Sequence, residues 1–125
     1  MKTIVLLLLF ATINSLHAQV DAQAYYYIYS HPDSAFNDIR DSEGETSFNV
    51  HINGDTIILY VEPVQVYLLE KVIRTEPYED GTVKVMYFKD QLNVICRVTL
   101  LMLPEHKEIN FTYSNSNHCF LIKGG

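Results

Sequence analysis

The histidines are the residues of this sequence with the widest range of chemistry. Four of them, His31, His51, His106 and His118, follow residue 18. A zinc site needs three or four converging ligands, and its usual trace in a sequence is a close pair such as His-x-His or His-x-x-x-His. None of the four has such a partner. The spacing therefore predicts solvated histidines, with no metal and no cofactor, unless the fold assembles a dispersed site.

The carboxylates do not define a site either. Residues 38–45 are acidic and contain a glycine, but a calcium loop requires glycine at its sixth position and glutamate at its twelfth. Counted from Asp41, Gly44 is fourth and Ile52 is twelfth. The chain also lacks the Gly-x-Ser-x-Gly turn of serine hydrolases. An enzyme, as a small secreted hydrolase or a metal-dependent enzyme using dispersed histidine and acidic residues, is therefore only the second hypothesis.

Cys96 and Cys119 are the two cysteines of the chain. In an oxidising compartment two cysteines usually pair, so we predict a disulfide between them. In a plain meander one strand would separate them and hold their Cα atoms nearly 10 Å apart, beyond the limit of about 7 Å for a disulfide. Either the bond is absent, or the last strand leaves the meander order and lies beside or opposite the strand of Cys96.

Tyrosine is the conspicuous aromatic residue, with nine copies beside six phenylalanines and no tryptophan. A strand through Tyr25, Tyr27 and Tyr29 would place these three side chains on one face. Tyrosine combines a large contact area with a polar tip, which is the profile favoured at interfaces. We therefore predict a contact surface on this strand, with Tyr60 and Tyr67 as neighbours. The alternative is ordinary packing, with the hydroxyl groups reaching solvent.

The first residues have the layout of a secretory signal peptide. A positive charge precedes an apolar run over residues 4–11, and a more polar segment ends at Ala18. The apolar run is too short to span a bilayer. We predict a signal peptide over 1–18, a single domain over 19–125, and a secreted or periplasmic protein. Cleavage after Ala22 is the alternative.

Charge and hydropathy limit the partners. Removal of the signal peptide would change the formal net charge from −6 to −7, because it carries one lysine. A negative domain is repelled by phosphate backbones, so nucleic-acid binding is not expected. No later run of about eighteen apolar residues follows, so the mature chain is expected to have no membrane span.

Most of the domain alternates apolar and polar residues with the period of a β-strand. The clearest unit is 47–61, where Asn53-Gly54 separates two alternating runs and predicts a hairpin with a type I′ turn. A second hairpin is predicted from 64–75 and 82–89. Residues 65–74 also fit helical spacing, but their branched side chains favour a strand.

Further strands are predicted at 25–30, 94–103, 108–113 and 118–123, and one short helix at 33–40, with Asp33 or Ser34 as its N-cap. The expected fold is therefore mainly all-β. It is a single antiparallel β-barrel or β-sandwich of about eight strands with at most one short helix, since either arrangement removes most exposed sheet edges.

The function favoured by these observations is a non-enzymatic binding or interaction module. Its partner could be a protein, a glycan or a small apolar ligand. A barrel with an open mouth would favour the small ligand, whereas a filled sandwich with a tyrosine face would favour a protein.

Overall fold

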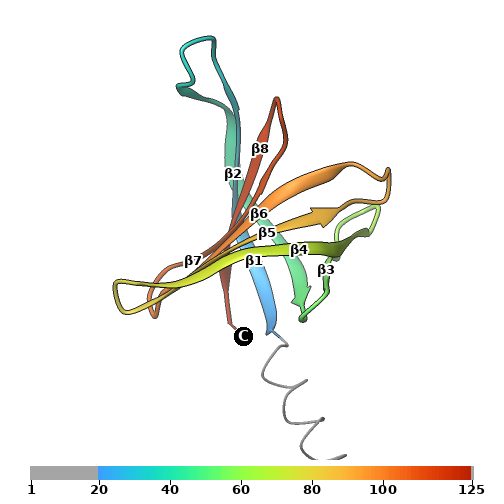
Figure 1. The fold of residues 1–125 in the computed structure, drawn as a ribbon, viewed down its shortest axis with the longest axis vertical. Helices are drawn as coiled ribbons and strands as arrows, with labels where there is room; N and C mark the ends of the chain where they lie inside the picture. The colour runs from blue at the N-terminus through green and yellow to red at the C-terminus, as the bar shows by residue number, and fades with distance from the viewer. Residues whose placement is uncertain (1–19, 125) are drawn as a thin grey trace, which may run out of the picture.

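The computed structural model describes residues 20–124, so the predicted signal peptide at 1–18 lies outside the described residues. One antiparallel sheet of eight strands closes into a barrel, with each strand beside its neighbours in the chain and β1 beside β8 (Figure 1). The strands are β1 (Val20–Pro32), β2 (Asp38–Ile52), β3 (Thr56–Leu59), β4 (Gln65–Tyr78), β5 (Gly81–Lys89), β6 (Ile95–Met102), β7 (Lys107–Thr112) and β8 (Asn117–Lys123). The all-β prediction of about eight strands is confirmed.

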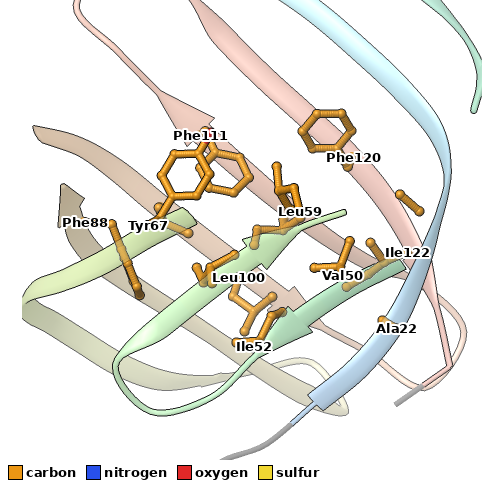
Figure 2. Close-up of a cluster of buried hydrophobic side chains, with 14 of the residues drawn as sticks. Ala22, Val50, Ile52, Leu59, Tyr67, Phe88, Leu100, Phe111, Phe120 and Ile122 are labelled. Atoms are coloured by element: carbon orange, nitrogen blue, oxygen red, sulfur yellow. The ribbon is translucent and has the colours of Figure 1, made fainter. Parts of the chain in front are cut away.

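The alternation of side chains fills the interior of the barrel. On β2, Val50 and Ile52 point inward while His51 between them points outward to Asp21. Inward residues from all eight strands form one cluster, and Figure 2 shows part of it between the facing walls of the sheet. Its most enclosed members, each no more than 1% exposed, include Val50, Ile57, Leu59, Val98 and Ile109. The middle of the barrel is therefore packed with side chains.

Both predicted hairpins are present, and residues 65–74 form strand rather than helix. The turn after β2 differs from the expected type, because neither Asn53 nor Gly54 has a positive φ. Instead, Asn53 Oδ1 accepts hydrogen bonds from the backbone N–H groups of Asp55 and Thr56 at 3.1 and 2.9 Å. At the other hairpin Gly81 is required, since a Cβ atom there would overlap the carbonyl oxygen of Met102.

The helix predicted at 33–40 is wrong, because no described residue is helical and this segment closes the β1–β2 hairpin. Asp33 caps a turn, with Oδ1 accepting from the N–H groups of Ala35 and Asn37 at 2.8 Å each. Phe36 then takes a φ of 64°, which reverses the chain. Ile39 pairs opposite His31 on β1, so cross-strand hydrogen bonds replace those of a helix. The hairpin extends beyond the barrel at the top of Figure 1.

A β-bulge at Tyr25 changes which tyrosines of β1 face the interior. Ala24 pairs opposite Ile122 of β8, and Tyr26 pairs opposite the next residue, Leu121, so Tyr25 is an extra residue on β1. The bulge shifts the alternation by one position. Tyr27 therefore packs against the core, while Tyr25 is 39% exposed. The expectation that Tyr25 shares a face of the strand with Tyr27 and Tyr29 is wrong, whereas Tyr27 and Tyr29 both pack against the core.

The predicted disulfide is also wrong, because both cysteines are free. The sheet keeps its meander order, so β7 lies between Cys96 on β6 and Cys119 on β8. The two side chains also lie on opposite faces of the sheet. Cys96 belongs to the interior cluster, whereas Cys119 precedes the inward Phe120, and its thiol donates to Glu108 Oε2 at 3.2 Å. Burial raises the pKa of the Cys119 thiol to about 12.

Within residues 20–124, no helix has the length and apolar character needed to cross a membrane.

The inward and outward positions give a matched test of the core. Ile109→Ala should lower the free energy of unfolding by about 2–5 kcal/mol, because it leaves a cavity at a side chain that is fully buried. Ile95→Ala, at an outward position that is 54% exposed, should lower it by less than about 1 kcal/mol. Urea denaturation followed by circular dichroism measures both. Equal losses in the two variants would contradict the assignment of faces.

The state of the cysteines has a direct chemical test. Protein unfolded in urea without a reductant should be alkylated by iodoacetamide at both Cys96 and Cys119, because the thiols are not bonded. Mass spectrometry of the intact chain counts the additions. A chain that takes up no label and is lighter by two hydrogens would show that the bond forms.

Candidate functional site

One end of the barrel is hollowed, and we call this end the mouth. Two adjoining hollows of about 410 and 290 Å³ lie there and share Gln65, Tyr67 and His118. The remaining lining residues are Tyr29, Thr46, Phe48, Leu59, Val61, Glu62, Val66, Asp90, Gln91, Leu92, Tyr113, Asn115, Ser116 and Phe120. They come from β1, β2, β3, β4 and β8 and from the loops 60–64, 90–94 and 113–116. The mouth therefore lies at the end of the barrel that carries the connections β1–β2, β3–β4, β5–β6 and β7–β8.

Aromatic rings form much of the wall of the mouth. The Tyr29 ring lies 4.7 Å from that of His118 and 6.0 Å from that of Phe120 between centroids. Phe48 on β2 meets Phe120 edge to face at 5.2 Å. Because these rings stand on three hydrogen-bonded strands, β8, β1 and β2, the sheet itself fixes their positions.

Tyr67 separates the mouth from the packed middle of the barrel. Its ring lies 4.5 Å from that of Phe111, and the two stand side by side in Figure 2. Its hydroxyl group donates to Gln65 Oε1 at 2.9 Å. Burial raises the pKa of Tyr67 to about 12, so the phenol stays neutral. The floor of the mouth therefore includes an aromatic ring that packs on the core and whose hydroxyl group is bonded to Gln65.

Asp90 organises the loop 90–94. Its Oδ1 atom accepts from the N–H groups of Leu92 and Val94 at 2.9 and 3.0 Å, and its Oδ2 atom accepts from the Tyr113 hydroxyl at 2.8 Å. Burial acts to raise the pKa of this carboxyl, but these hydrogen bonds outweigh it and lower the pKa. Burial and the bond to Asp90 together raise the pKa of Tyr113. The pair is thus an ionised carboxylate held by a neutral phenol.

His118 is the polar group placed most directly in the mouth, because it lines both hollows. Burial lowers the pKa of its imidazole, and within residues 20–124 no other cause moves it. The ring is therefore neutral at physiological pH, with one nitrogen able to donate a hydrogen bond and the other able to accept one. These groups are available to a ligand.

The other described histidines lie away from the mouth, each beside a carboxylate. His31 pairs with Asp41 at 2.8 Å, and His51 pairs with Asp21 at 2.6 Å. His106 contacts Glu108 at 2.9 Å near the opposite end of the barrel. Within the part of the chain that the structure describes, no three His, Cys, Asp or Glu side chains gather closely enough to hold a metal ion.

The five predicted contact tyrosines are divided between two places. Tyr29 and Tyr67 line the mouth, and Tyr27 packs beside Tyr29 with ring centroids 4.8 Å apart. Tyr25 and Tyr60 lie on the outside, where they are 39% and 50% exposed. They do not form one patch, and their role in contacts with a partner stays a prediction.

Sequence reasoning missed Phe48, Tyr113 and His118 as members of one site. Their separation along the chain is large, and only closure of the sheet brings them together. A local signal was present for two of them, since Tyr113 and His118 flank the connection between the strands predicted at 108–113 and 118–123, but no predicted turn at this end of the sheet lies near Phe48.

A larger hollow of about 640 Å³ lies at β1, β2 and the end of β8, lined by Asp21, Ala22, Gln23, Asn49, Val50, Lys123 and Gly124. It is more open to solvent than either hollow of the mouth. A small ligand gains most where the pocket covers most of its surface. The mouth is therefore the better candidate site.

No family model, curated protein or solved structure matches this chain significantly.

The neutral state of His118 predicts a pH dependence of stability. Its folded pKa lies below the ordinary value of 6.5, so the unfolded chain binds the proton more readily. The free energy of unfolding should therefore fall as pH is lowered through and below about 6.5. His118→Phe should reduce that fall. Urea midpoints at pH 7.5 and 5.5 for both proteins measure the difference, and an unchanged fall in the variant would contradict the assignment.

Proposed function

We propose that this protein is a non-enzymatic binding module that takes a small, largely apolar ligand into the mouth of its barrel. The observation that carries the proposal is the pair of adjoining hollows, about 410 and 290 Å³, walled by aromatic rings at one end of a barrel that is otherwise packed. Ligand pockets for small molecules typically measure about 300–1,000 Å³ and have apolar walls with few polar groups.

The polar groups of the mouth would orient the ligand. The Gln65 amide, the Tyr67 hydroxyl and the His118 ring lie where the two hollows meet. The apolar body of a ligand would contact rings such as Tyr29 and Phe48, while a single polar substituent would reach this junction. Because the rings stand on paired strands, little ordering would accompany binding, which favours affinity.

The geometry gives the enzymatic hypothesis no support of its own. In the described part of the mouth, His118 has no carboxylate bonded to it that would orient it as a general base. Burial raises the pKa of both Cys96 and Cys119, which keeps their thiols protonated and weakly nucleophilic. The hypothesis of a small hydrolase or metal-dependent enzyme therefore stays a prediction, and the described residues offer no catalytic site for it.

The proposal also includes the location of the protein, which we expect to be exported from the cytoplasm. The layout of residues 1–18 supports secretion or a periplasmic location, in which a small ligand would be met outside the cytoplasm. The exposed side chains of Tyr25 and Tyr60 leave a protein or glycan contact on the outside of the barrel as a separate prediction.

The binding proposal can be tested with N-phenyl-1-naphthylamine, an uncharged probe whose fluorescence rises in apolar surroundings. The mature protein should bind it saturably at one site. Thr46→Trp should weaken binding about tenfold or more, because Thr46 lines the smaller hollow and an indole ring would fill it.

Ser47→Trp is the matched control for this experiment. Ser47 is the next residue of β2 and points outward, where its hydroxyl accepts from Gln23 Nε2 at 2.9 Å. This variant adds the same ring to the other face of the sheet and should bind like the parent. Equal affinity of the two variants, or no saturable binding by the parent, would reject the mouth as the site.

A further inference from the structure

We infer that the ligand of the mouth carries a positive charge, as an organic ammonium group on an apolar body. The inference rests on the proposed function and adds the chemical class of the ligand. It is carried by the charged groups and the aromatic side chains that line the two hollows.

The charged groups of the mouth are all acidic. Glu62 lines the smaller hollow and Asp90 lines the larger, so each hollow has one carboxylate. Among the described lining residues there is no lysine or arginine. The nearest cation in the sequence, Lys89, instead pairs with Glu70 at 3.0 Å, and Glu70 lines neither hollow.

The ionisation states of the lining side chains also favour a negative net charge in the mouth. Asp90 is held as a carboxylate by the hydrogen bonds from Tyr113 and from its own loop. His118, the one basic side chain of the lining, is kept neutral by burial. No described ion pair neutralises Glu62. The electrostatic potential in the hollows is therefore negative. An anionic ligand would find no positively charged partner there.

The aromatic walls favour a cation over an uncharged ligand. A ring attracts a cation that lies over its face within about 6 Å of the centroid, and the attraction is strongest where water is excluded. Tyr29, Tyr67 and Tyr113 come from three different strand ends around the same opening. Aromatic rings that surround a site recognise substituted ammonium groups, and a nearby carboxylate adds an attraction between opposite charges. The chain also has a formal net charge of −6, which would speed the approach of cations.

A matched set of three probes tests the charge of the ligand. 4-Phenylbutylammonium, 4-phenylbutan-1-ol and 5-phenylpentanoate share the phenylbutyl body and differ in charge. Isothermal titration calorimetry at pH 7.5 and low salt gives each affinity, and the ring signals of His118 in NMR spectra report occupancy of the mouth. The ammonium compound should bind tightest and the carboxylate weakest, and added salt should weaken only the ammonium compound.

Two variants separate local charge from the general charge of the protein. Glu62→Gln should weaken the ammonium compound only about two- to fivefold, because the carboxylate is exposed and water screens its attraction, and should leave the alcohol unchanged. Glu105→Gln removes the same charge at the opposite end of the barrel, in the segment between β6 and β7. It should change neither affinity.

The outcomes distinguish the two proposals. If none of the three probes binds, or if binding leaves the His118 signals unmoved, the mouth is not a ligand site and the proposed function fails. If the alcohol or the carboxylate binds as tightly as the ammonium compound, the mouth binds ligands but the charge assignment is wrong. If Glu62→Gln and Glu105→Gln have equal effects, the cation preference does not arise in the mouth, and this overturns the inference.

Discussion

The pairing of β1 with β8 is the contact on which the rest of the structure depends. It runs from Gln23 opposite Lys123 to Ser30 opposite Asn117 and turns an open sheet into a ring. Without it both strands would be free edges, open to pairing with other chains. The same pairing sets Tyr29 beside His118, with ring centroids 4.7 Å apart. One strand pair therefore closes the core and builds the aromatic wall of the mouth.

Much of the fold could be predicted because its information is local. Antiparallel neighbours in a meander are also neighbours in the chain, so alternation such as that of Val50 and Ile52 specifies strand, face and partner together. Predictions failed where one side chain can stabilise two local structures. The carboxylate of Asp33 can cap a helix or a turn, and here the pairing of Ile39 with His31 decides for the turn.

The candidate site could not be predicted, because its geometry depends on events far apart in the sequence. The bulge at Tyr25 turns Tyr27 and Tyr29 inward, and no residue type in this tyrosine-rich run signals where an extra residue is accommodated. His118 is identified as a mouth residue only once β8 is known to lie beside β1. The position of β8 in the sheet also explains why the disulfide is absent, since the Cys119 side chain points away from the interior in which Cys96 lies.

The register of β1 against β8 also fixes a direction for the whole molecule. Gln23 and Lys123 are paired at one end of the barrel, whereas Tyr29 and His118 meet at the other, and Figure 1 shows the C-terminus beside the start of β1. A molecule tethered to a support through Gly124 would hold its aromatic opening away from that support. Immobilised copies would then share one orientation, with the hollows facing the solution.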